Sequence, residues 1–306
     1  RALADWDPDR YGDLRFPTSD LCYDVLSQVG RAVGPDRDRS GVDPLEGLAV
    51  ARVVAVGNTI PAARLPTYSD AAHPLHHVFD GFYLQDLNDT VVPLAKGLDV
   101  PAKLQVRDDV DVPVVVVNTT TAVADSTPQP EAANIRVWEP AGSSHTTGAF
   151  MVRTAEATRR DTGLDSPVCP ADVANTLPLQ YISGAALVAL HRHAETGAPV
   201  PSFPRIDRSG AAEDGRVAFD ASGNVAGGLR TPWVDVPVAR YEWRGECLGG
   251  AGRTYPFEPS KLEELYGTPE EYRRRFLAAA HGAEARGALL AHDVAQAIED
   301  SAKIGW

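Results

Sequence analysis

Four short apolar segments constrain the fold of this chain more than any other feature of the sequence. They are residues 49–56, 79–84, 112–117 and 135–138, which are apolar except for residues such as Arg52, Asp80 and Arg136, and clusters of Pro, Gly, Asn and Thr lie between them. A continuously apolar strand is buried on both faces, which is typical of a parallel sheet that lies between two layers of helices. The pattern therefore predicts an α/β fold with a mostly parallel sheet flanked by helices.

Helical periodicity appears before and after these segments. A first helix is expected between an N-cap at Ser19 or Asp20 and a stop at Gly34. Its apolar face is formed by Leu21, Val25, Val29 and Val33. Further helices are expected at residues 181–196, 269–287 and 291–303, with Pro- and Gly-rich loops over 197–252. We therefore expect one domain over 1–306, with a sheet core in 1–150 and a helical, loop-rich part in 151–306.

Charge and hydropathy argue against two classes of partner. The chain carries 29 Lys and Arg against 42 Asp and Glu, and its net charge of −13 is unfavourable for binding a polyanion. Its apolar runs, such as residues 112–117, are far shorter than the roughly 20 residues of a membrane helix. We expect no nucleic-acid partner and no membrane span, whereas the compartment and the oligomeric state stay open.

The cysteines and histidines carry weaker signals. Three cysteines are too few for a disulfide framework and contain no C-x-x-C pair. Cys169 and Cys247 lie in Pro- and Gly-rich segments, so they are either free thiols or, in an exported protein, one loop-stapling disulfide. His73, His76 and His77 form a cluster with no carboxylate beside it at ligand spacing, so we expect no metal site and no cofactor.

The end of the first apolar segment carries a motif with catalytic potential. The strand runs into Gly57-Asn58-Thr59-Ile60-Pro61-Ala62. An α/β-hydrolase places its nucleophile elbow, G-x-S-x-G, at such a strand-to-helix junction. The first glycine is present, but Thr59 replaces serine and Pro61 replaces the last small residue. The hexapeptide alone leaves both an ordinary turn and a modified elbow open.

A histidine follows the last apolar segment. His145 lies in a loop just after residues 135–138, where the general base of an α/β-hydrolase comes in chain order. The acid is expected after the strand 112–117. The loop 118–125 offers only Asp125, and Glu131 is the next choice.

Several longer segments extend the likeness to the whole chain. They are residues 19–31, 48–68, 73–82, 112–122, 135–145, 262–272 and, most specifically, 223–241, which contain GGLRTPWVDVPVARY. Over nearly all of its length the chain resembles the bacterial "alpha/beta hydrolase domain" family of esterase-like proteins. The resemblance implies an α/β-hydrolase fold. Only some fifty residues precede the elbow and Met151 is the only methionine, so the early strands are expected to be missing, as in an N-terminally truncated member.

The resemblance also implies a reaction, the hydrolysis of a small-molecule carboxylic ester through an acyl-enzyme. Thr59 stands where the family has its nucleophilic serine, and the Ile60 N–H would donate to the oxyanion. His145 matches the family's histidine, and Asp125 is the candidate acid. Asn58 and Arg230 are expected to line the substrate pocket.

Departures from the family pattern support a second hypothesis. Thr120 and Ala122 occupy places where the family has acidic residues, and Thr59 replaces the serine. Pro61 disfavours helical backbone at Ile60 and so disturbs the oxyanion donor. The alternative is a catalytically inactive protein that keeps the fold as a binding or scaffolding module.

Overall fold

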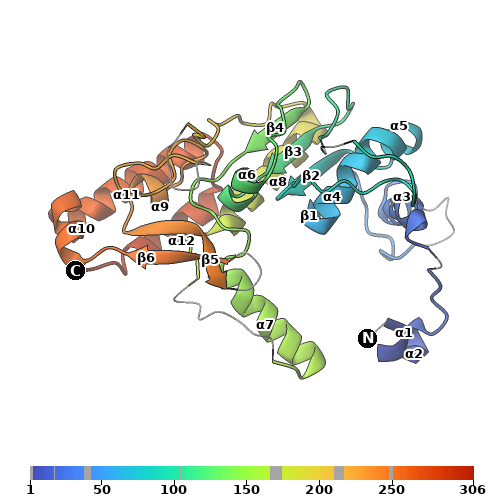
Figure 1. The fold of residues 1–306 in the computed structure, drawn as a ribbon, viewed down its shortest axis with the longest axis horizontal. Helices are drawn as coiled ribbons and strands as arrows, with labels where there is room; N and C mark the ends of the chain where they lie inside the picture. Colours follow the sequence, from blue (N-terminus) through green and yellow to red (C-terminus); the bar gives the residue numbers. More distant parts are fainter. Residues whose placement is uncertain are drawn as a thin grey trace.

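The computed structural model describes residues 3–16, 18–37, 43–101, 103, 105–165, 174–209, 217–247 and 251–306. Its centre is a four-stranded parallel sheet in the order β1-β2-β3-β4 (Figure 1). The strands are β1 (Val54–Asn58), β2 (Gly81–Gln85), β3 (Val114–Val117) and β4 (Ile135–Trp138). All neighbours pair in parallel, so the α/β fold with a parallel sheet flanked by helices is confirmed.

Helices cover both faces of the sheet, which is why its central strands are apolar throughout. On one face, α8 (Leu179–Thr196) packs in the same core cluster as Tyr83, Val115 and Val117. On the other, α4 (Ile60–Thr67) packs with Phe82 and Val116. Every residue of β3 is buried. The alternation of side chains along a strand therefore supplies two separate cores.

The first strand differs from the sequence prediction. It begins at Val54, not at residue 49, and the Val56 side chain is 57% exposed. Within the residues that the structure describes, β1 is the edge of the sheet and no strand precedes it. The prediction that this strand is buried throughout is therefore wrong for one of its two faces.

The first helix also turns a different face inward. A 3₁₀ turn, η1 (Ser19–Leu21), is capped by Thr18 and leads into α3 (Cys22–Val33). Val29 of the predicted apolar face is exposed, whereas Tyr23, Ser27 and Gly30 are buried. Gly30 explains the orientation, since a Cβ there would lie 2.5 Å from Val78 Cγ1. The helix packs closely through its small residues and not through its valines.

Short helices occupy the amino-terminal region and the connections between strands. They are α1 (Leu3–Trp6), α2 (Pro8–Tyr11), the π-helix η3 (Tyr68–Ala72), α5 (His73–His76) and α6 (Thr120–Asp125). In Figure 1, α1 and α2 lie apart from the sheet, at the end of an extended segment.

The second half of the chain is mainly helical, with one hairpin that the sequence did not indicate. Its elements are α7 (Gly148–Thr162), α8, α9 (Pro232–Asp235), α10 (Pro259–Tyr266), α11 (Pro269–Ala285) and α12 (Ala291–Ser301). The antiparallel hairpin joins β5 (Ala239–Cys247) to β6 (Ala251–Pro256). No helix in the described ranges has the length and apolarity needed to cross a bilayer. The Cys169–Cys247 pairing lies outside the described residues, and Cys22 is a free thiol.

Candidate active site

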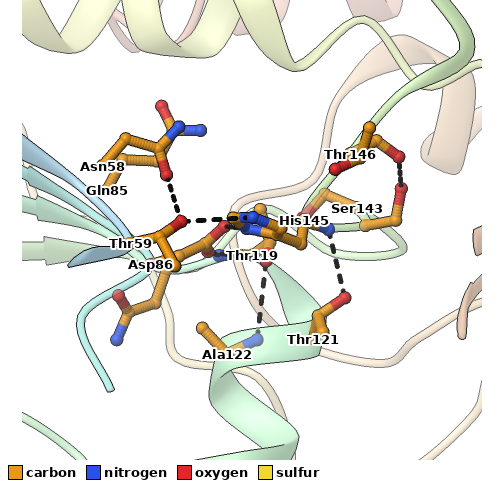
Figure 2. A network of polar contacts seen from close by, with 12 residues as sticks. Asn58, Thr59, Gln85, Asp86, Thr119, Thr121, Ala122, Ser143, His145 and Thr146 are labelled. Carbon is orange, nitrogen blue, oxygen red and sulfur yellow. Dashed lines mark hydrogen bonds and ion pairs between the residues drawn. The ribbon is translucent and has the colours of Figure 1, made fainter. Parts of the chain in front are cut away.

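The carboxyl ends of the parallel strands bring the candidate residues to one edge of the sheet. Thr59 directly follows β1, Asp86 directly follows β2, and Thr119 comes two residues after β3. His145 lies in the loop after β4. Parallel strands end at the same edge, so residues from four separate parts of the sequence meet there. Figure 2 shows this cluster.

Thr59 occupies a sharp turn between β1 and α4. Its backbone angles are φ 57° and ψ −103°, a region that β-branched residues rarely adopt. Its N–H donates to the Gln85 carbonyl at 3.0 Å, which ties the turn to the end of β2. At Gly57 a Cβ would lie 2.8 Å from Ala62 N, so the close approach of strand and helix requires glycine. This strained strand-to-helix turn is the geometry of a nucleophile elbow.

Two contacts connect the cluster in the order of a catalytic triad. The Thr59 Oγ1 lies 3.1 Å from His145 Nε2, and His145 Nδ1 lies 2.5 Å from Asp86 Oδ2 (Figure 2). The Thr59 hydroxyl also lies 2.8 Å from Asn58 Oδ1, to which it can donate. It has one hydrogen for two acceptors, so the protonation of Nε2 decides which acceptor receives it.

Asp86 is held firmly in place and is nearly buried, at 4% exposure. Its Oδ1 accepts the Thr119 N–H at 2.8 Å and the Thr119 hydroxyl at 2.6 Å. Its Oδ2 remains for His145. The hydrogen bond to Asp86 raises the pKa of His145, and partial burial of the imidazole opposes that rise. The carboxylate thus fixes the tautomer with Nδ1–H and leaves the Nε2 lone pair facing Thr59.

The amino end of α4 supplies N–H donors beside Thr59. Ile60 is the first residue of α4, and its N–H belongs to the first turn, where no intrahelical acceptor exists. Pro61 lies in that same turn, where a missing N–H costs no helical hydrogen bond. Ile60 is the first helical residue in spite of Pro61, so the expected loss of helical backbone at Ile60 is not found.

A pocket of about 520 Å³ opens beside the cluster. Its lining includes Asn58, Thr59, Gln85, His145, Phe150 and Arg153. Thr59 and His145 also line a smaller pocket of about 230 Å³, together with Asp86 and Asp125. The hydroxyl and the imidazole are therefore accessible to a small molecule, and Asn58 lies in the lining of the larger pocket.

The expected acid residues lie elsewhere. Asp125 is the last residue of α6 and forms an ion pair with Arg244 of β5 at 2.5 Å. Glu131 accepts the Val137 N–H at 3.0 Å and so supports β4. The carboxylate on His145 Nδ1 is Asp86, so the expectation for Asp125 is corrected. The usable signal in the sequence was that Asp86 is the first acidic residue after the apolar segment 79–84.

Arg230 also differs from its predicted place. Its guanidinium donates to Asp235 at 2.7 Å and to Asp220 at 2.9 Å, and two backbone carbonyls accept from it as well. It is not among the residues that line the 520 Å³ pocket. Arg230 therefore organises the loop around it, and its predicted place in the substrate pocket is corrected.

Residues 223–241, which carry the most specific part of the family resemblance, position the loop that contains His145. Leu229 exchanges two backbone hydrogen bonds with that loop, accepting from Ala141 N at 3.0 Å and donating to Glu139 O at 2.8 Å. Gly228 has φ 71°, and a Cβ there would lie 2.6 Å from Glu139 O. The motif thus acts through close backbone pairing near the start of the loop that carries His145.

An ion pair between the buried Glu139 and the partly exposed Arg205 anchors the same loop and gives a test of its stability. Glu139 is fully buried, and its two carboxylate oxygens accept from Arg205 Nη2 at 2.6 Å and Ile206 N at 2.7 Å. Arg205→Ala would leave this buried charge without its counter-ion, at a cost of about 3 kcal/mol in the free energy of unfolding. Denaturant unfolding measures the difference. Arg159→Ala, which breaks the exposed pair with Asp165, is the control, and an equal loss in both variants would contradict the prediction.

The comparisons with known proteins agree with this architecture. No curated protein and no solved structure matches the chain. A family described as "Alpha/beta hydrolase domain" matches residues 1–299, which is nearly the whole chain and includes both Thr59 and His145. The parallel sheet, the elbow and the family match together show that this chain belongs to the alpha/beta hydrolase domain family.

Proposed function

We propose that this protein hydrolyses small carboxylic esters through an acyl-threonine intermediate. The observation that carries the proposal is the pair of contacts Thr59 Oγ1–His145 Nε2 at 3.1 Å and His145 Nδ1–Asp86 Oδ2 at 2.5 Å. A hydroxyl, an imidazole and a buried carboxylate in this order are what acyl transfer requires. Membership of the family supports a hydrolase fold for this chemistry.

The proposed reaction has two steps. In the first, His145 Nε2 accepts the Thr59 proton as Oγ1 attacks the ester carbonyl, and the same proton then goes to the leaving alcohol as the C–O bond breaks. In the second, His145 takes a proton from water, whose oxygen attacks the acyl carbon. The bond between that carbon and Thr59 Oγ1 then breaks, the carboxylic acid leaves, and His145 returns the proton to Oγ1. Asp86 stabilises the imidazolium in both steps, and the Ile60 N–H donates to the oxyanion.

The pocket suggests which esters fit. Phe150 and Leu179 provide apolar surface for a short acyl chain, while Gln85 and Ser183 offer polar groups. Arg153 adds a positive charge to the lining. A volume of about 520 Å³ suits a small-molecule ester, so we infer such a substrate.

One observation favours the alternative of an inactive binding module, namely threonine in place of serine at the strained turn. The extra methyl group of Thr59 adds crowding where φ is 57°. Reaction with a fluorophosphonate separates the two hypotheses. We expect a phosphonylated Thr59, identified by peptide mass spectrometry, together with turnover of a short-chain aryl ester and loss of both in His145→Ala. An unlabelled Thr59 and no turnover above that of Thr59→Ala would support the binding module.

The pH dependence should follow His145. The imidazole must be neutral to accept the Thr59 proton, and its pKa is raised by the hydrogen bond from Nδ1 to Asp86. We expect kcat/KM to reach its maximum at pH values above this raised pKa and to fall as the pH decreases through it. The acid limb should therefore lie above about 6.5, the ordinary pKa of histidine. Initial rates on an aryl ester between pH 5 and 9, corrected for the buffer-catalysed rate, measure the limb. A midpoint below that ordinary value would contradict the assignment.

A further inference from the structure

A second cluster of chemically active side chains lies away from the proposed catalytic residues. His73 begins α5, His77 follows that helix, and Asp111 lies in the connection before β3. These segments precede β2 and β3, so the cluster is at the amino ends of the strands, whereas Thr59 is at the carboxyl ends. The sequence showed no carboxylate beside the histidines, but the fold brings Asp111 to them from 38 residues away. The third histidine, His76, is separate and contacts Ser27.

The distances in the cluster match those between ligands of one metal ion. His73 Nε2 lies 3.1 Å from Asp111 Oδ1, and His77 Nδ1 lies 3.5 Å from Asp111 Oδ2. One donor atom from each residue lies within 4.8 Å of the other two. In a tetrahedral zinc site with bonds of about 2.0–2.1 Å, neighbouring ligand atoms are about 3.3 Å apart. The two short distances involve different oxygens of Asp111, so one ligand pair already has this spacing, and a small rotation of the exposed Asp111 and His77 side chains would bring in the other.

Burial divides the three residues into one fixed and two accessible ligands. The His73 side chain is 1% exposed and packs edge-on against Phe82 at 5.2 Å. The side chains of His77 and Asp111 are 61% and 56% exposed. An ion can therefore enter from solvent and keep water at its remaining position.

The surroundings of His73 limit the affinity. A metal on Nε2 requires the proton on Nδ1, and Nδ1 is buried with no hydrogen-bond partner among the described residues. Most metal-binding histidines donate this second N–H to an acceptor, and its loss weakens binding on the order of 10- to 100-fold. We therefore expect weaker binding than at a zinc site with a complete set of outer hydrogen bonds.

We propose that His73, His77 and Asp111 bind one Zn²⁺ ion, with water completing the coordination. Two imidazoles and one carboxylate favour zinc over the oxygen-preferring Mg²⁺ and Ca²⁺. The ion would tie the segment before β2 to the segment before β3. It would therefore stabilise the folded sheet, because the ligands converge only in the folded state. This proposal does not depend on ester hydrolysis.

The test uses the full chain without a histidine tag. Calorimetric titration with Zn²⁺ should give one equivalent of bound ion and an increase in melting temperature, and Co²⁺ should give the visible absorption of a tetrahedral site. His77→Ala and Asp111→Asn should each weaken Zn²⁺ binding at least 10-fold, on the order expected for losing part of the site. His281→Ala is the matched control, since His281 is an exposed histidine paired with Glu284 at 3.2 Å. It should bind like the wild type.

Three results would overturn the proposal. The first is no stoichiometric binding of Zn²⁺ to the wild-type chain. The second is unchanged affinity in both His77→Ala and Asp111→Asn. The third is loss of the bound equivalent in His145→Ala, which would place the ion on the candidate active site. None of these readouts uses catalytic activity, so they also distinguish failure of this site from failure of the proposed hydrolase function.

Discussion

Thr59→Ala is expected to lower the rate of ester hydrolysis by as much as about 10⁶-fold, because loss of a nucleophile removes the acyl-enzyme route altogether. The Thr59 Oγ1 is the hydroxyl that contacts His145 Nε2. Without it, His145 and the helix N-terminus can assist only direct attack by water. Initial rates on a short-chain aryl ester measure the loss, and the absence of an acyl adduct by mass spectrometry identifies its cause. A variant that retains wild-type turnover would exclude Thr59 as the nucleophile.

Thr59→Ser is the matched variant that keeps the hydroxyl. Serine removes only the methyl group, and the backbone at φ 57° and ψ −103° is less crowded without a β-branch. We expect acyl transfer to be faster than in the wild type, while Thr59→Ala stays inactive. If serine abolishes activity as completely as alanine, residue 59 acts through its packing and not through its oxygen.

The sequence predicted the parts of the fold that depend on local pattern. The buried strands β2 and β3 are apolar on both faces, so their hydrophobicity alone identified them. The buried face of α3 was predicted wrongly because hydrophobic periodicity identifies apolar side chains but does not indicate how closely the helix packs against its neighbours. Gly30 packs inward where Val78 leaves no room for a side chain, and Ser27 packs inward through a hydrogen bond with the Tyr68 hydroxyl. The hairpin β5–β6 was missed because the Pro- and Gly-rich composition of residues 197–252 was interpreted as loop, although the two strands are adjacent in the sequence.

The candidate site was predicted where a single strand-to-loop junction defines a residue. Thr59 and His145 each follow an apolar segment, and the structure places them in contact. The acid could not be found in the same way, because every parallel strand ends at this edge and acidic residues follow more than one of them, such as Asp86 after β2 and Asp125 after β3. Which carboxylate reaches His145 depends on the order of the strands in the sheet, β1-β2-β3-β4, and this order cannot be read from the sequence. The metal candidate Asp111 was missed for the same reason.

Asp86→Asn is expected to lower the hydrolysis rate roughly 10⁴-fold, as the loss of the carboxylate does in related triads. The hydrogen bonds of Asp86 explain why. Oδ1 accepts both the N–H and the hydroxyl of Thr119, so an asparagine would keep its carbonyl oxygen at that position. Its amide NH₂ would then face His145 Nδ1 and donate to it. The imidazole would carry its proton on Nε2 and could no longer accept the proton of Thr59.

The comparison with Asp125→Asn makes this prediction specific. Asp125 is half-exposed and paired with Arg244, so its loss should leave the hydrolysis rate unchanged. The pH profile provides a second readout that a purely structural role of Asp86 would not move. Without the Asp86 carboxylate, the hydrogen bond that raises the pKa of His145 is lost. The acid limb of the residual activity should therefore shift to lower pH. The melting temperature of each variant serves as the control for folding. A larger loss in Asp125→Asn than in Asp86→Asn would return the role of the acid to Asp125 and show that the contact between Asp86 and His145 is not the one that catalysis uses.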